Sequence, residues 1–193
     1  MKTIKQEFEE MAQEYHEKDS IRELVIQTSR NMLKLAKQAI YDTHKQKYED
    51  AKTKLQQARQ EWENSLPKKQ ELKDQETNAL QPAIEEYIEA LLFQTYVQEQ
   101  KILLKEEINA PEDISSTIYL QALSDFTGEL AREALEHATE KETNEIKKII
   151  QTCEDIQEGF LLFNFRNSEL RRKNDALQKN IQKIKQLYYE VTR

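Results

Sequence analysis

Four carboxylates lie at positions where the helical pattern of the chain predicts apolar or neutral side chains. Glu86 and Glu89 lie three residues apart in the segment "IEEYIEALLFQTYV". Asp125 and Glu129 lie four residues apart in "YLQALSDFTGELAR". Residues at these spacings share one face of a helix, so each pair points in one direction. Because an unpaired buried carboxylate is costly, each of these acids needs a cation, a proton or a metal ion.

If the two segments form facing helices, the carboxylates converge into a set of hard oxygen ligands that suits Mg²⁺ or Mn²⁺. An ion held there could activate water and offset charge on a phosphate that is being cleaved. Spacing alone instead favours ordinary ion pairs with lysine and arginine, for example with Arg132. A di-iron site is disfavoured because it normally adds a Glu-x-x-His pair on each of two helices, whereas none of the 3 histidines follows these acids by three residues.

The elements that would position these acids are long helices. Apolar residues recur with the helical period along almost the whole chain, and no segment shows the alternation typical of a strand. With only 2 Gly and 3 Pro the chain has little turn punctuation, and its 37% hydrophobic and 34% charged residues suit amphipathic helices. The pattern predicts an all-α, single-domain bundle of about six or seven helices over residues 1–193.

Helix boundaries are predicted from caps and prolines. Ser20, with Glu23 three residues later, forms a capping-box pattern, which predicts that a new helix begins at Ser20 after a weak first apolar stripe. Pro67 is expected to end the helix that carries Tyr48. Further helices are predicted from Pro82, from Ser116 to about His137, from Ile146 to Phe163 and from Ser168, with Asn174 on a coiled-coil-like seam of the last one.

Charge and composition exclude several classes of protein. The net charge of −7 excludes binding of nucleic acid by bulk charge, but it permits a local basic groove. The single cysteine, Cys153, excludes an internal disulfide and a zinc cluster, and we expect it to lie in the core with Trp62. The start "MKTIKQEFEE" is not a signal peptide, and no apolar run approaches the roughly 18 residues of a membrane span. A soluble, cytoplasmic protein without a membrane partner is expected.

The two acid-bearing segments resemble the translin family, and more closely its catalytic branch, that of translin-associated factor X. "EYIEALLFQ" and "YLQALSDFTGEL" are similar to its EYVEA-S-FQ and YL-----DLTGEL helices, and "SRNMLKLAKQAIYDTHK" is similar to its SR------K--I---HR helix. Asp125 and Gly128 match the catalytic branch, because the translin branch lacks this Asp and has Ser-Glu-Leu in place of Gly-Glu-Leu. The block from Gly159 to Val191 looks like translin instead, and the short connection between Lys105 and Ser116 departs from the catalytic branch.

The resemblance implies an all-α protomer of roughly seven helices that assembles into a hollow, barrel-like ring, commonly an octamer. It also implies a metal-dependent endoribonuclease that cleaves single-stranded RNA at the inner wall, with Mg²⁺ or Mn²⁺ as cofactor. The family's catalytic and metal-binding acids fall on Glu86, Glu89, Asp125 and Glu129. Because one chain combines features of both branches, we expect a homo-oligomer. A non-catalytic binder of single-stranded RNA or DNA and a helical scaffold protein are the alternatives.

Cations that could bind RNA phosphates lie close to one face of the helix that contains "SRNMLKLAKQAIYDTHK". They are Arg30, Lys34, Lys37, His44 and Lys45, with Tyr41 available to stack on a base. A solvated helix face balanced by surface acids is an equally good interpretation of each single residue. A second basic cluster serves either RNA or contacts between subunits, and consists of Arg166, Arg171, Arg172 and Lys173.

Gly128 lies between Asp125 and Glu129, although Gly weakens a helix by about 1 kcal/mol relative to Ala. Because Gly has no Cβ, a neighbouring helix, a metal shell or an RNA backbone could approach closely. Simple relief of helix packing is the alternative. His137 continues the stripe formed by the two acids and is expected to be a surface residue and not a metal ligand.

Overall fold

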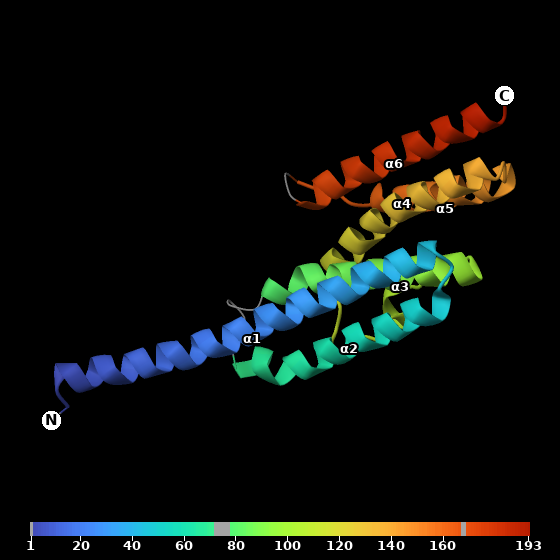
Figure 1. Ribbon diagram of the computed structural model, residues 1–193. Coiled ribbons are helices and arrows are strands. Elements are labelled where there is room, and N and C mark those ends of the chain that lie inside the picture. Colours follow the sequence, from blue (N-terminus) through green and yellow to red (C-terminus); the bar gives the residue numbers. More distant parts are fainter. Residues whose placement is uncertain (1, 72–77, 167–168) are drawn as a thin grey trace.

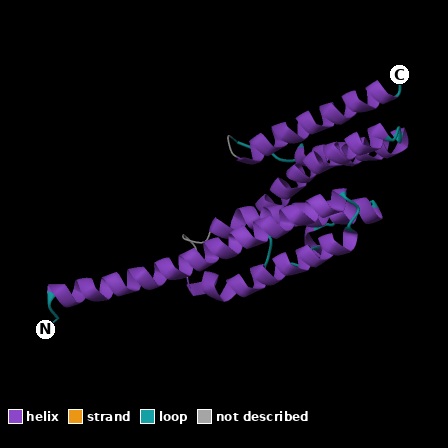
Figure 2. Cartoon of the chain, in the orientation of Figure 1, coloured by secondary structure: helices purple, strands orange, loops and turns teal. Residues whose placement is uncertain are grey.

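The computed structural model describes residues 2–71, 78–166 and 169–193. These residues form six α-helices: α1 (Ile4–His44), α2 (Tyr48–Glu71), α3 (Gln81–Glu99), α4 (Ser116–Thr139), α5 (Thr143–Phe160) and α6 (Glu169–Val191). Two short 3-10 helices, η2 (Asn78–Leu80) and η3 (Lys105–Glu107), lie in the connections before and after α3. Figure 2 shows helices and loops but no strands in the described part of the chain. The all-α prediction and the helix count are confirmed.

The helices form two sets of three. α1 packs against both α2 and α3, while α4 packs against α5 and α6. The contact between α3 and α4 joins the two sets, as Figure 1 shows. The two acid-bearing segments are therefore neighbouring helices in the middle of the molecule, as the prediction of facing helices requires.

The first helix is longer than predicted. Ser20 does not begin a new helix; its hydroxyl donates to the backbone carbonyl of His16, at 2.9 Å, inside α1. This bond to the preceding turn satisfies the side chain without ending the helix. The N-cap is Thr3, whose hydroxyl accepts from the Gln6 N–H at 3.3 Å, while the Gln6 side chain accepts from the Thr3 N–H at 2.9 Å. The capping box thus lies at the start of a single helix of 41 residues.

Other helix ends differ by smaller amounts. α2 continues past Pro67 to Glu71, because a proline that close to the end removes only one hydrogen bond of the last turns. Pro82 lies in the first turn of α3, where its missing N–H costs nothing. Phe163 lies beyond α5 and is 49% exposed, so its predicted place in that helix is wrong. The predicted start at Ser168 lies outside the described residues.

The core fills the space inside each set of helices and the contact between α3 and α4. Its largest fully buried side chains include Met32, Trp62, Phe93 and Phe126, each of which stabilises the fold by roughly 1.5–3 kcal/mol through burial. Cys153 is buried as well, so both core predictions for Cys153 and Trp62 are confirmed. The predicted seam of α6 is buried at Leu177, Ile181 and Ile184.

The N-terminal half of α1 projects beyond the other helices (Figure 1). It presents an apolar stripe that no other described element covers: Ile4, Phe8, Met11 and Tyr15 are 74%, 64%, 56% and 67% exposed. A helix with an uncovered apolar face offers a surface for association. None of the described helices combines the length and the apolar character needed to cross a membrane.

Candidate metal and RNA site

The packing of α3 on α4 brings the predicted acids into one electrostatic environment. Glu89 is only 8% exposed. Burial raises its pKa to about 9, and the charges of Glu86, Asp125 and Glu129 add to the shift. Burial likewise raises the pKa of Glu86; Lys37 opposes this shift, and Asp125 and Glu129 add to it. The α4 carboxylates therefore disfavour the charged forms of Glu86 and Glu89 on α3, which is the behaviour of acids that lack a sufficient counter-charge.

The predicted acids do not, however, touch one another closely. Among the described residues, three potential metal-ligand atoms within 4.8 Å of one another occur only at His137, Glu140 and Glu142. Protein cations instead approach three of the predicted acids, and only Glu89 forms no ion pair with a described residue. The structure thus contains the ion pairs that spacing alone favoured, together with one buried acid that they leave uncompensated.

Lys173, near the start of α6, is the cation at Asp125. Its ammonium group donates to the carboxylates of both Asp125 on α4 and Glu85 on α3. Burial raises the pKa of Glu85 to about 6, even though Lys173 opposes this shift. Glu85 is absent from the predicted set, although it lies four residues before Glu89 and a search for i, i+4 acid pairs would have found it.

His44 has a different environment from the one expected. Its side chain is only 4% exposed. Nε2 lies 2.6 Å from Glu129 Oε2, and Nδ1 lies 3.2 Å from Glu133 Oε2. Burial disfavours the charged ring, but the hydrogen bonds to the two glutamates outweigh it and raise the His44 pKa. A ring enclosed in this way is not free to contact an RNA phosphate, so the predicted RNA contact of His44 does not fit the structure; His44 holds Glu129 instead.

A basic groove of about 650 Å³ runs along α1 and α2. It is lined by three of the cations predicted to bind RNA, Arg30, Lys34 and Lys37, and by Tyr41, which is 54% exposed. Lys54 of α2 lines it too and forms an ion pair with Asp42; sequence reasoning missed it because α2 joins the groove only through tertiary packing. Lys45 is exposed but does not line this groove.

A second cavity, of about 480 Å³, adjoins the basic groove. It is lined by Glu85 and Glu86 of α3, Asp125 of α4 and Lys173 of α6. Leu33 and Lys37 of α1 line both spaces, so the basic groove and the acidic cavity are neighbours that share these two side chains. The Lys37 ammonium lies 3.9 Å from Glu86 Oε2 at this junction.

The donor set of this region fits a hard divalent cation. It consists of carboxylate oxygens, which are the ligands that Mg²⁺ and Mn²⁺ prefer. The buried Glu89 carboxyl has no ion-pair partner among the described side chains, and burial together with the neighbouring acids raises its pKa to about 9.

Comparison with known proteins shows to which family the chain belongs. A model of the Translin family matches residues 20–192. The chain belongs to the Translin family. A sequence search of curated proteins found no match.

Solved structures share the fold of this translin-family chain. A structure described as apo-NeC3PO superimposes with a TM-score of 0.85 at 23% identity, covering 95% of this chain and 96% of that one. A complex of AfC3PO with duplex RNA gives a TM-score of 0.84 at 23% identity, covering 96% of both chains. A second AfC3PO structure gives 0.80 at 23% identity, with 96% and 97% covered. These likenesses support the translin-type, all-α fold.

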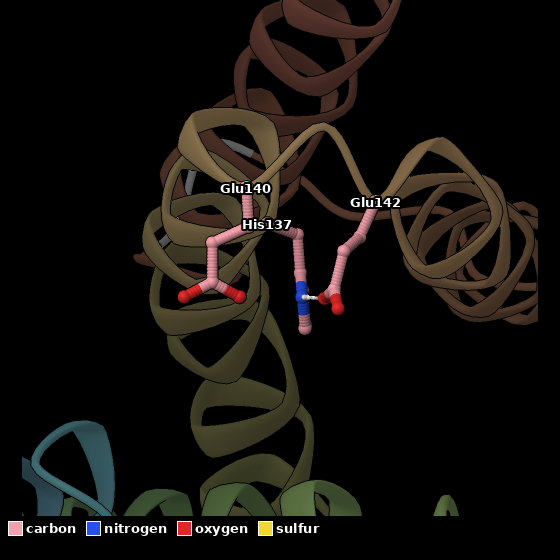
Figure 3. A group of neighbouring side chains, drawn as sticks. All are labelled: His137, Glu140 and Glu142. Atoms are coloured by element: carbon pink, nitrogen blue, oxygen red, sulfur yellow. Dashed lines mark hydrogen bonds and ion pairs between the residues drawn. The ribbon is translucent and has the colours of Figure 1, made fainter.

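A separate cluster of the translin-family chain lies at the turn between α4 and α5. Figure 3 shows His137, Glu140 and Glu142, with His137 Nδ1 2.7 Å from Glu142 Oε2. Both glutamates are exposed, and His137 is partly exposed. Since exposed acidic groups of this kind are common without a metal ion, we assign no site to them.

Gly128 of α4 lies beside α6. A Cβ at Gly128 would lie 3.6 Å from Asn180 Nδ2, which is an ordinary contact. Close approach of a neighbouring helix within the protomer therefore does not require this glycine. We expect Gly128→Ala to raise the free energy of unfolding by about 0.5–1 kcal/mol, because Ala favours a helix over Gly.

Urea denaturation measures this effect. Gly159→Ala is the matched comparison, because a Cβ at Gly159 of α5 would meet nothing within 4 Å. A Gly128→Ala protein that is less stable than the wild type would contradict the prediction. If the variant is more stable but binds RNA more weakly, we infer that Gly128 allows the RNA backbone to approach α4 closely.

Proposed function

We propose that this chain is a metal-dependent endoribonuclease that cleaves single-stranded RNA within a homo-oligomeric barrel, with an octamer as the expected form. The observation that carries the proposal is that Leu33 and Lys37 line both the basic groove and the acidic cavity. Phosphates held by the groove cations would bring the neighbouring part of an RNA chain beside the acids. Membership of the Translin family and the fold shared with an RNA-bound structure support the RNA-binding part.

Glu86, Glu89, Asp125 and Glu129 would hold Mg²⁺ or Mn²⁺. When bound, such an ion stabilises charge on the scissile phosphate and lowers the pKa of a water molecule that it binds. The chain's own residues orient the parts: His44 holds Glu129 at 2.6 Å, Lys173 holds Asp125, and Lys37 lies at the junction where a phosphate would pass from the groove. Tyr41 offers an exposed ring on which a base can stack.

The proposal is tested with the purified protein and end-labelled RNA. Single-stranded and duplex RNA of the same sequence are each incubated with Mg²⁺, with Mn²⁺ and with EDTA. Internal cleavage of the single strand that requires the metal supports the proposal. Because one similar structure is a complex with duplex RNA, the duplex arm decides the strand preference. The absence of cleavage in every arm contradicts a nuclease.

RNA affinity should depend on the groove lysines. In Lys34→Gln and Lys37→Gln, one lost phosphate contact each should reduce the slope of log affinity against log salt by roughly 0.7–0.9 and weaken binding at low salt. Lys148→Gln is the matched control, because this exposed lysine lies on α5 and pairs with Glu145. Fluorescence anisotropy with a labelled single strand, over a salt series, measures the slopes. Equal slopes for all three variants would contradict an RNA path through this groove.

The oligomeric part of the proposal rests on uncovered apolar surface. Besides the α1 stripe, Leu161 and Leu162 after α5 are 72% and 86% exposed. Light scattering of the purified chain measures the assembly: a mass near 23 kDa, that of one chain, contradicts a ring.

A non-catalytic binder of single-stranded RNA or DNA is the second candidate. The observation that favours it is that Lys173 and His44 already compensate Asp125 and Glu129. It predicts tight binding of nucleic acid that falls with salt and no metal-dependent cleavage. A scaffold protein, the third possibility, predicts no nucleic-acid affinity even at low salt.

A further inference from the structure

Lys173 is held in the acidic cavity at both its backbone and its side chain. The Ser124 hydroxyl of α4 donates to the Lys173 carbonyl at 2.7 Å, which fixes the start of α6 beside Asp125. The side chain is only 19% exposed, and its ammonium donates to Asp125 and Glu85. Lys173 is therefore a built-in part of the cavity wall and not a mobile surface lysine.

The two partners of Lys173 come from different helices and have different surroundings. Asp125 on α4 is 32% exposed, and Glu85 on α3 is 14% exposed. Both face the cavity that Glu86 also lines. An ammonium group has three donors and can retain one carboxylate partner when it loses another. Glu85 is thus a second acceptor that can keep Lys173 in the cavity when Asp125 binds another cation.

We propose that Lys173 is the resident counter-ion of the acidic cavity, and that it must release Asp125 and remain on Glu85 before Asp125 can bind a divalent cation. The proposal rests on the metal site of the proposed function. It follows from competition for the same oxygens: an ammonium that donates to the Asp125 carboxylate occupies lone pairs that a metal ion needs. In the absence of a metal, Lys173 compensates an acid that would otherwise be left unpaired beside Glu86.

Mn²⁺ binding to the RNA-free protein tests the competition directly. The signal of free aqueous Mn²⁺ in electron paramagnetic resonance reports the dissociation constant without any need for activity. We expect Lys173→Met to bind Mn²⁺ roughly 10-fold more tightly than the wild type, because a partly buried competing charge is removed. Lys173→Arg, which keeps the charge, should bind no more tightly than the wild type.

Lys148→Met is the matched control for a general change of charge. Lys148 is 56% exposed, pairs with Glu145 on α5 and does not line the cavity, so its removal should change Mn²⁺ affinity by less than about 3-fold. Equal gains for Lys148→Met and Lys173→Met would overturn specific competition at Asp125. Thermal unfolding of each variant confirms that it is folded.

A double-mutant cycle with Glu85→Gln separates retention on Glu85 from simple electrostatics. If Glu85 receives the released ammonium, Glu85→Gln weakens Mn²⁺ binding in the wild type and has little effect in Lys173→Met. An equal weakening in both backgrounds overturns the role of Glu85.

Asp125→Asn separates this proposal from the proposed function. If this change abolishes Mn²⁺ binding while Lys173→Met has wild-type affinity, competition is overturned and the metal site stands. If Asp125→Asn leaves Mn²⁺ binding unchanged, or if neither the wild type nor Lys173→Met binds Mn²⁺, the metal site and the competition both fail.

Discussion

Asparagine in place of Asp125 should reduce metal-dependent RNA cleavage by on the order of 100-fold or more, the loss typical when one group that stabilises the transition state is removed. The substitution keeps the size of the side chain but removes the charge that would hold a metal ion. RNA affinity should remain close to that of the wild type, because Arg30 and Lys34 line the separate basic groove and not the acidic cavity.

Two measurements on the same preparation check this result: the single-turnover cleavage rate with Mg²⁺ and the dissociation constant for the labelled strand in EDTA. Asp155→Asn is the matched control, because Asp155 is exposed on α5 and accepts a hydrogen bond from Gln151. Cleavage by Asp125→Asn at the wild-type rate would rule out Asp125 as a metal-binding or catalytic acid. A parallel loss of RNA affinity would point to misfolding or to a changed groove.

Glutamine in place of Glu89 should stabilise the metal-free protein by roughly 2–4 kcal/mol at about pH 7, on the basis that each pKa unit corresponds to about 1.4 kcal/mol. Burial raises the Glu89 pKa from 4.5 to about 9, so at neutral pH the folded state holds a proton that the unfolded chain does not. Taking up that proton costs free energy. The neutral Gln side chain, with nearly the same shape, removes the cost.

The sign of the pH dependence follows from this difference. Between pH 4.5 and about 9 the folded wild type binds more protons at Glu89 than the unfolded chain, so its stability falls as the pH rises. Below this window both states are protonated and the advantage of Gln disappears. Urea denaturation in EDTA at pH 4.5 and pH 8 measures the difference in stability between Glu89→Gln and the wild type. Glu158→Gln, at an exposed position, is the control. A Glu89→Gln protein that is less stable than the wild type at pH 8 would contradict the raised pKa.

Mn²⁺ gives the same substitution a second readout. A ligand that binds only the folded state stabilises it in proportion to the logarithm of its concentration above the dissociation constant. Mn²⁺ should therefore raise the melting temperature of the wild type, whereas Glu89→Gln should show a much smaller increase.

The helical fold and the proximity of the acids could be predicted because both depend on local periods. Apolar residues at helical spacing predicted the helices. Acids three or four residues apart predicted which faces of α3 and α4 point toward the same region. The continuity of α1 could not be predicted in this way. The Ser20 pattern fits a cap and a helix interior equally well, and only the structure shows that its hydroxyl donates to the His16 carbonyl inside α1.

The ion pairs could not be predicted because they join residues distant in sequence. His44 and Glu129 are 85 residues apart, and Lys173 and Asp125 are 48 apart. Position on a helix face indicated that His44 is near the groove lysines. It did not indicate that α4 would enclose the ring and turn it toward Glu129. Lys173 belonged to a basic run whose other members carry no comparable contact to the acids in the described structure.

Lys37 lines both the groove and the cavity, so in the proposed function it would link RNA binding to cation binding. A phosphate that draws the Lys37 ammonium away from Glu86 leaves this carboxylate less compensated, so the affinity of Glu86 for another cation rises. Coupling free energies between two sites are reciprocal, so a cation at Glu86 must raise the affinity for the phosphate by the same factor. If the groove binds RNA and the cavity binds a cation, as proposed, each ligand would therefore strengthen the binding of the other through Lys37.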